Sequence, residues 1–267
     1  MKEASNALDR WDGRPVAALQ RDWGVPALHA LATCASTNDE ARRLAELGAA
    51  HGTVVVADHQ SAGRGRHGRA WVDRPAASLL LSMVLRPRGG GADASALPLR
   101  VGLAAARALR ARTGLDVRIE WPNDLVVADR KVGGVLCEAA YAEGRLDFVI
   151  AGIGINVETL PDGLDDATRT RATSLIDAGA RDVARAELAG AIARGLAALA
   201  ADGPIAAAEL EELRALDSLV GRAVRLGAGR EGVARGILPD GALVVDTGEG
   251  TISVRAGSVA PAAPRFS

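Results

Sequence analysis

Between residues 117 and 157 the sequence is a series of short apolar runs broken by glycine or polar residues, and this pattern constrains the fold more than any other feature. The runs are residues 117–120, 125–128, 132–141 and 146–157. Short apolar runs separated by turn-forming residues are typical of strands joined by tight connections. The pattern predicts hairpins in a largely antiparallel sheet.

Two further strands are expected before this region. Residues 53–57 and 78–85 are short, apolar and rich in valine or leucine. From 94 to 112, leucine, valine and alanine recur at helical spacing before Gly114, which predicts a long helix covering one sheet face. Alanine-rich helices are expected at residues 184–201 and 204–216.

The Ser-Thr-Asn-Asp-Glu run at residues 36–40 matches a capping box between Thr37 and Glu40. It predicts a helix over residues 41–47 that ends at Gly48. Capping is one interpretation of the three polar residues that open this run, and ligand binding is the other.

Composition divides the chain into four parts. Residues 1–24 are polar with scattered alanine, and we expect a short packed extension or a partly ordered arm. Residues 25–216 carry the predicted sheet and helices. Residues 217–260 contain glycine-punctuated short strands typical of a small β-barrel, and residues 261–267 form a frayed tail.

Bulk charge argues against a general nucleic-acid binder, because a formal net charge of −1 gives no field that attracts polyanions. The N-terminus has no secretory pattern, and no apolar stretch reaches the ~20 residues that span a bilayer. Cys34 and Cys137 lack metal-ligand or redox spacing, and the four histidines show none either. We therefore expect a cytoplasmic protein with reduced thiols, no membrane contact and no structural metal.

A glycine-alternating arginine loop carries the main functional signal. Residues 61–71 read Ser-Ala-Gly-Arg-Gly-Arg-His-Gly-Arg-Ala-Trp. Glycine lets the backbone approach a ligand closely, and arginine offers planar forks for carboxylate and phosphate oxygens, so the loop predicts an anionic ligand. Its spacing matches neither the dinucleotide fingerprint nor the Walker loop, and it is too short for a disordered arginine-glycine segment.

Lysine usage singles out one more position. Of 32 basic side chains, only Lys2 and Lys131 are lysine, so a compact ammonium at Lys131 is expected to matter, although a plain surface lysine is the alternative. Trp71 offers an aromatic face for a base or serves as a hydrophobic plug. Asn123 and Asp124 can read a purine amino group, hold magnesium through water, or simply form a turn. Together these residues favour a site that activates a carboxylic acid with a nucleotide.

Five motifs in order and spacing resemble the biotin protein ligase family. They are Ser36-Thr37-Asn38 with Gln60, Gly63 to Arg69, Trp121-Pro122-Asn123-Asp124-Leu125, Lys131 to Leu136, and Gly152-Ile153-Gly154-Ile155-Asn156. The resemblance implies an α+β fold with a central mixed, largely antiparallel sheet flanked by helices, similar to class II synthetases, and then an SH3-like β-barrel. It implies that biotin and Mg-ATP form biotinyl-5′-AMP, and that a lysine of a biotin carboxyl carrier protein accepts the biotinyl group.

The resemblance also implies roles for individual residues, with Lys131 and Arg66 as the catalytic pair. The biotin-binding residues would be Ser36, Thr37, Asn38, Gln60, Gly63, Arg64, Gly65, Arg66, Lys131, Gly134 and Gly152. The ATP-binding and adenylate-binding residues would be Arg66, Arg69, Trp71, Asn123, Asp124, Lys131 and Asn156. No metal site made of protein ligands alone is implied, since magnesium would arrive with ATP.

Two departures from the family pattern stand out. The family commonly has lysine immediately before Trp-Pro-Asn-Asp, whereas this chain has Glu120; Arg118 would compensate, or Glu120 would help to hold magnesium. About 35 residues precede the Ser-Thr-Asn motif, too few for the repressor domain of some members, so we expect no DNA binding.

The expected oligomeric state is a monomer or weak homodimer. A lipoate or octanoate ligase is the nearest rival, and a non-catalytic biotin-binding or docking module is the alternative of another class.

Overall fold

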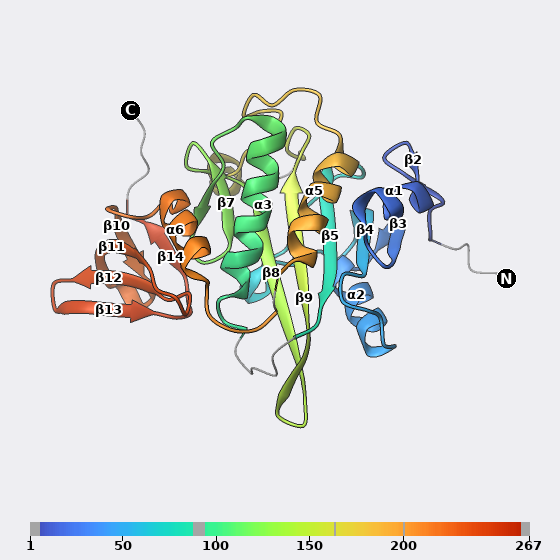
Figure 1. Cartoon of the computed structure of the whole chain (residues 1–267). Coiled ribbons are helices and arrows are strands. Elements are labelled where there is room, and N and C mark those ends of the chain that lie inside the picture. The colour runs from blue at the N-terminus through green and yellow to red at the C-terminus, as the bar shows by residue number, and fades with distance from the viewer. Residues whose placement is uncertain (1–5, 88–93, 163, 200, 263–267) are drawn as a thin grey trace.

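The computed structural model describes residues 6–87, 94–162, 164–199 and 201–262, and its centre is a seven-stranded sheet (Figure 1). The strand order is β3-β4-β5-β9-β8-β7-β6, and only the β3–β4 pair is parallel. The strands are β3 (Leu28–Cys34), β4 (Val54–Gln60), β5 (Ser78–Leu85), β6 (Arg118–Glu120), β7 (Asp124–Val127), β8 (Arg130–Ala142) and β9 (Arg145–Asn156). The predicted mixed, largely antiparallel sheet is confirmed.

The longest hairpin joins β8 to β9 through Glu143 and Gly144, which have φ angles of 52° and 75°. Two consecutive residues in the left-handed region form the two-residue turn that matches the twist of antiparallel strands. This hairpin was expected from the Ala-Glu-Gly break between two apolar runs.

Helices α1 (Val16–Trp23), α3 (Leu97–Thr113) and α5 (Arg185–Ala197) cover one face of the sheet (Figure 1). They bury the main core together with alternate strand residues such as Leu79, Leu81 and Ile153. The long helix α3 ends at Gly114, whose φ of 69° is the left-handed conformation expected of a helix stop. This face of the sheet therefore carries the main hydrophobic core.

Helix α2 (Thr37–Glu46) packs against the opposite face over β4, β5 and β9. Its alanines, Ala41 and Ala45, bury a smaller core with Val55, Val84 and Ile150. Because α2 is short, it covers only part of this face. The uncovered remainder is where the candidate site lies.

Several local expectations need correction. The part of residues 1–24 that the structure describes contains a short hairpin of β1 (Arg10–Trp11) with β2 (Arg14–Pro15), followed by α1. Helix α2 begins four residues earlier than predicted, with Ser36 as its N-cap, whose hydroxyl accepts from the Asn38 backbone N–H at 3.3 Å. The alanine-rich helices α5 and α6 (Ala207–Leu216) are confirmed within a few residues.

The C-terminal strands form a separate five-stranded antiparallel sheet in the order β13-β12-β11-β10-β14 (Figure 1). They are β10 (Ala223–Leu226), β11 (Glu231–Ile237), β12 (Leu243–Thr247), β13 (Gly250–Val254) and β14 (Val259–Pro261). The two outer strands, β13 and β14, are not paired with each other in the described residues, so the sheet is open and a closed barrel is not confirmed. The end of the predicted tail, residues 263–267, lies outside the described residues.

Arg185 fastens the N-terminal segment to the sheet and α5. Its guanidinium lies 3.3 Å from Asp12 and 2.9 Å from Asp58, and it stacks over the Trp11 ring at 4.9 Å. Only 8% of the Arg185 side chain is exposed. A buried cation between two carboxylates leaves unpaired charges when it is removed.

We therefore predict that Arg185→Ala lowers the free energy of unfolding by about 3 kcal/mol. Arg181→Ala, at an exposed arginine four residues earlier, is the control and should change it by less than about 0.5 kcal/mol. Urea denaturation followed by circular dichroism measures both. Equal stability of the two variants would contradict this role of Arg185.

Candidate ligand-binding site

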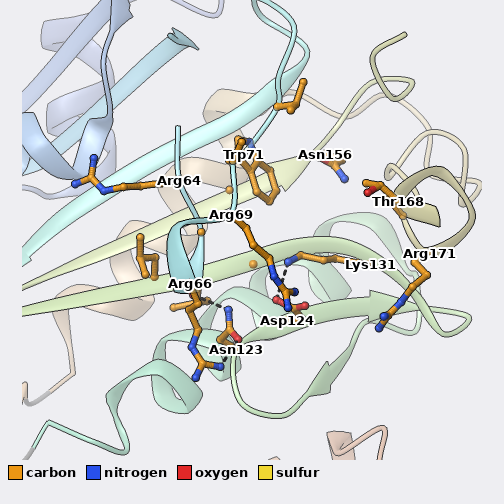
Figure 2. A pocket seen from close by; sticks show the side chains of 18 of the residues that line it. Arg64, Arg66, Arg69, Trp71, Asn123, Asp124, Lys131, Asn156, Thr168 and Arg171 are labelled. Atoms are coloured by element: carbon orange, nitrogen blue, oxygen red, sulfur yellow. Dashed lines mark hydrogen bonds and ion pairs between the residues drawn. The ribbon is translucent and has the colours of Figure 1, made fainter. Parts of the chain in front are cut away.

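A cavity of about 740 Å³ lies on the sheet face that α2 leaves open. Its walls come from the arginine loop, the β6–β7 turn, helix α4 (Asp166–Arg171) and residues 257–260 (Figure 2). It is lined by Ser36, Thr37, Asn38, Gln60, Arg64, Gly65, Arg66, Arg69, Trp71, Asn123, Asp124, Lys131, Gly134, Gly152 and Asn156. The structure thus brings together every predicted site residue except Gly63.

Glycines make the floor of this cavity. In β9, strand alternation turns Ile153 and Ile155 into the core and leaves Gly152 and Gly154 on the cavity face. A Cβ at Gly152 would lie 2.1 Å from the Asn38 Oδ1, and one at Gly154 would lie 2.7 Å from the Trp71 ring. The residue prediction missed Gly154, although its spacing from Gly152 was the available signal.

One end of the cavity is a network of neutral polar groups. The Gln60 Oε1 accepts from the Thr37 backbone N–H at 2.7 Å and from its hydroxyl at 3.0 Å. The Ser82 hydroxyl donates to the Asn38 Oδ1 at 2.6 Å and lies 2.8 Å from the Thr37 hydroxyl. These groups are positioned before any ligand arrives, so they can select a ligand with matching donors and acceptors.

Asn38 connects this end to the neighbouring strand. Its Nδ2 donates to the Glu138 carboxylate at 2.6 Å and to the Leu136 carbonyl at 3.3 Å. Ser36 and Asn38 therefore lie both at a helix cap and in the cavity wall. The capping and ligand-binding interpretations of this run are compatible in geometry.

The arginine loop is itself a small hairpin. The Gly65 N–H donates to the Arg69 carbonyl at 2.7 Å, and the Trp71 N–H donates to the Gly63 carbonyl at 2.9 Å. Gly63 is buried and does not line the cavity. A Cβ there would lie 2.8 Å from Gln60 and 2.9 Å from the Trp71 carbonyl. The need for glycine at this position is explained by close packing at the base of the loop.

Arg64 is held by protein carboxylates. Its guanidinium forms a two-pronged pair with Asp39, with one bond of 2.8 Å, and lies 3.5 Å from Glu138. Hydrogen bonding to Arg64 lowers the pKa of Asp39. Sequence reasoning missed both carboxylates, since neither lies in the loop motif. In this conformation Arg64 fastens the loop to α2 and β8.

Arg66 has neutral partners instead. It donates to the Asn123 Oδ1 at 3.2 Å and to the Gly257 carbonyl at 3.3 Å, while the Asn123 Nδ2 donates to the Val135 carbonyl at 2.9 Å. Burial lowers the pKa of Arg66. A partly buried cation among neutral acceptors favours a neighbouring anion.

Lys131 lies at the centre of the cavity. Its Nζ forms an ion pair with the Asp124 Oδ1 at 2.8 Å, and Figure 2 shows Arg69 pointing into the same space. Both atoms are close to Gly134, where a Cβ would lie 3.2 Å from the Lys131 Nζ. The scarcity of lysine in the sequence thus pointed to a side chain that lies between the neutral polar end of the cavity and the end lined by Arg66 and Arg69.

Trp71 packs at the edge of the cavity floor, as the hydrophobic-plug interpretation expects, and its predicted role beside a base stays a prediction. Its ring packs on Gly154 at the edge of the floor, and it also lines the cavity. Its Nε1 is buried and has no acceptor among the residues that the structure describes. Asn156, at the end of β9, donates from Nδ2 to the Thr173 carbonyl at 3.0 Å.

Comparison with known proteins decides the family. The model described as the Biotin/lipoate A/B protein ligase family matches residues 32–156. The biotin--[acetyl-CoA-carboxylase] ligase of Mycobacterium tuberculosis is 35% identical over 246 residues, covering 88% of this chain and 89% of that protein. The chain belongs to the biotin protein ligase family. The structure of the Aquifex aeolicus biotin protein ligase in complex with biotin and ATP matches with a TM-score of 0.70 at 29% identity, covering 89% of this chain and all of that chain.

The match to longer relatives is partial. The bifunctional ligase/repressor BirA of Bacillus subtilis is 37% identical over 151 residues, which are 57% of this chain and 46% of that protein. The chain therefore spans about half the length of the Bacillus family members that it matches. The ligase of Mycobacterium tuberculosis, by contrast, aligns over most of its length.

Both cysteines of this family member are free, and burial raises the pKa of each thiol to about 12. No described group of three or more His, Cys, Asp or Glu side chains is placed to hold a metal ion. Among the described helices, none combines the length and apolar character needed to cross a membrane.

At its point of departure from the family pattern, the chain has an unusual carboxyl group. Burial raises the pKa of Glu120 to about 7, with a further contribution from the Asp124 carboxylate. Arg171 lies 3.8 Å from it. Arg118, expected as the compensating cation, instead donates to the Ala215 carbonyl at 3.0 Å and does not line the cavity.

The raised pKa of Glu120 predicts a pH-dependent stability. In the unfolded chain this carboxyl ionises near its ordinary value of 4.5, whereas in the folded protein it stays protonated up to about pH 7. Relative to Glu120→Gln, the wild type should lose on the order of 3 kcal/mol of stability as the pH rises from 4.5 to 7, and no more above that. Urea midpoints of both proteins at pH 5 and pH 8 measure this difference. Parallel pH profiles would show that Glu120 is not perturbed.

Proposed function

We propose that this protein activates biotin with Mg-ATP to biotinyl-5′-AMP and transfers the biotinyl group to a lysine of a biotin carboxyl carrier protein. The observation that carries the proposal is one continuous cavity with a neutral polar end, a cationic end and Lys131 between them. A relative of known structure, the Leishmania major biotin protein ligase, was solved in complex with biotinyl-5-AMP and matches with a TM-score of 0.61 at 28% identity.

Biotin would occupy the glycine-floored end. The Thr37, Asn38 and Gln60 groups offer donors and acceptors for its ureido ring, and the lack of a side chain at Gly134 and Gly152 lets Lys131 and Asn38 pack close to the sheet beside it. The remaining proposed contacts are Ser36, Arg64, Gly65 and, as a packing residue beneath the loop, Gly63. The order of these groups directs the biotin carboxylate toward Lys131.

ATP would occupy the cationic end, with its base near Trp71, Asn123 and Asn156, and its phosphates near Arg66 and Arg69. The donor set for magnesium is Asp124 with the Asn123 amide, which suits an ion held mainly by phosphates and water, as Mg²⁺ prefers. When bound, Mg²⁺ supplies positive charge to the phosphate oxygens.

In the first step the biotin carboxylate oxygen attacks the α-phosphorus, and the bond from this phosphorus to the bridging oxygen breaks. The electron pair leaves with pyrophosphate. Charge builds on the non-bridging oxygens in the transition state, and Lys131 and Arg66 stabilise it. Lys131 is paired with Asp124 in the free protein, so it would exchange part of this contact for the reacting oxygens.

In the second step the amine of the carrier lysine attacks the carbonyl carbon of the mixed anhydride, AMP leaves, and one proton is released. Catalysis would rest on positioning and electrostatics, without a covalent bond to the enzyme. A closed SH3-like barrel at residues 217–260, a main domain at residues 25–216, the cytoplasmic location, the monomeric or weakly dimeric state and the lack of repressor activity remain predictions of this proposal.

The test is to supply biotin, lipoate and octanoate together with Mg-ATP and identify the acyl-adenylate by mass spectrometry. Wild type should form biotinyl-AMP, and Lys131→Ala should slow its formation about 10²–10³-fold through loss of a stabilising charge. Arg130→Ala, at the exposed neighbouring residue, should stay within about twofold of the wild type.

The alternatives give different outcomes in the same test. A lipoyl or octanoyl adenylate would assign the protein to the rival ligases. Binding of biotin without any adenylate would favour the non-catalytic module. Full activity of Lys131→Ala would remove the proposed role of that residue.

A further inference from the structure

Helix α4 carries an arginine into the cavity that no sequence motif included. Asp165 caps this helix by accepting from the Thr168 N–H at 2.7 Å, and Arg171 is its last residue. Directly after it, the Thr173 N–H donates to the Lys131 carbonyl at 2.8 Å. The backbone thus holds Arg171 beside the strand that carries Lys131, and Figure 2 shows Arg171 and Arg66 on opposite sides of Lys131 and Asp124.

The contact between Arg171 and Glu120 is asymmetric. The distance of 3.8 Å is longer than a hydrogen bond, and 68% of the Arg171 side chain is exposed against 11% of Glu120. The carboxyl group is therefore fixed in the cavity wall, while the long guanidinium side chain is free to shift. An ion pair at this distance, with an exposed arginine, contributes little to stability.

The other charges around Glu120 do not neutralise it. Asp124 and Asp129 raise its pKa, and Arg222, which lowers it, is paired with Asp129 at 2.8 Å. Above about pH 7, where Glu120 is ionised, a polyanionic ligand entering this end would meet its negative charge unless a cation stood between them. Arg171 is the cavity-lining cation closest to that position among the described residues.

We propose that Arg171 binds the polyphosphate chain of the nucleotide and, with Glu120 as its anchor, shields that chain from the buried carboxyl group. This inference rests on the proposed function, because it assigns a residue to the nucleotide of that reaction. In the free protein the guanidinium lies 3.8 Å from the Glu120 carboxyl group at the cavity wall. On nucleotide binding the guanidinium turns from the carboxyl group to the β- and γ-phosphate oxygens, for which its planar fork is suited.

Calorimetric titration with α,β-methylene-ATP, which cannot be cleaved between its α- and β-phosphates, tests the proposal in the presence of saturating biotin at pH 8, where Glu120 is ionised. Arg171→Ala should weaken binding of this analogue about tenfold and binding of AMP less than about twofold. Arg169→Ala is the matched control: it lies on the same helix, is exposed and does not line the cavity, so it should leave both affinities unchanged.

The double variant Arg171→Ala/Glu120→Gln separates shielding from a general loss of charge. If Arg171 shields the phosphates from Glu120, removal of the carboxylate should restore the affinity to within about threefold of the wild type. Unchanged binding in Arg171→Ala, an equal loss for AMP, or no recovery in the double variant would each overturn the proposal. A protein that binds the analogue as described but forms no biotinyl-AMP from ATP would contradict the proposed function and not the role of Arg171.

Discussion

The side-chain alternation of β9 is the constraint on which both halves of this structure depend. Successive residues point to opposite faces, so Ile153 and Ile155 seal the main core, while Gly152 and Gly154 let the Asn38 side chain and the Trp71 ring pack directly on the other face. A shift of one residue in the pairing with β5 would put the isoleucines into the cavity and the glycines into the core. The same hydrogen-bonded register therefore specifies the packed face and the binding face together.

The charged side chains of the cavity lie around the glycine face of β9. The neutral polar network around Asn38 lies over the glycine floor, where α2 begins, and the cations come from the arginine loop, from β8 and from α4. Carboxylates at Asp124 and Glu120 lie below these cations. These carboxylates keep the Lys131 and Arg171 side chains near the cavity before a ligand arrives. This reduces the reorganisation that binding and catalysis require.

Sequence reasoning predicted the elements whose signal is local and missed the contacts made across the fold. The strand at residues 78–85 was placed to the residue, because a run of apolar side chains buried on both faces has clear ends. Helix α1 was missed, since only Leu19 and Trp23 are buried in it and its packing partner lies on α5. The glycine and arginine motifs located the cavity because they lie within single loops and strands.

What the sequence did not show was the pairing of those motifs with distant side chains. Asp39 and Glu138 hold Arg64, and Arg171 meets Glu120 from a helix about fifty positions away. Such pairs have no fixed spacing and depend on how helices and loops meet over the sheet. The resemblance to a family supplied the expected roles, but the Arg118 guanidinium, offered as one compensation for Glu120, donates to the Ala215 carbonyl and does not line the cavity.

The most direct test of the glycine floor, on which Asn38 packs, is a calorimetric titration of biotin into Gly152→Ala, with Gly102→Ala as control. A methyl group at Gly152 would collide with Asn38, whereas at Gly102 in α3 it meets nothing within 4 Å. We predict at least a tenfold loss of biotin affinity for the first variant and an unchanged affinity for the second. Wild-type affinity in a folded Gly152→Ala protein would contradict the account, because the position of Asn38 on this glycine would then not matter for biotin binding.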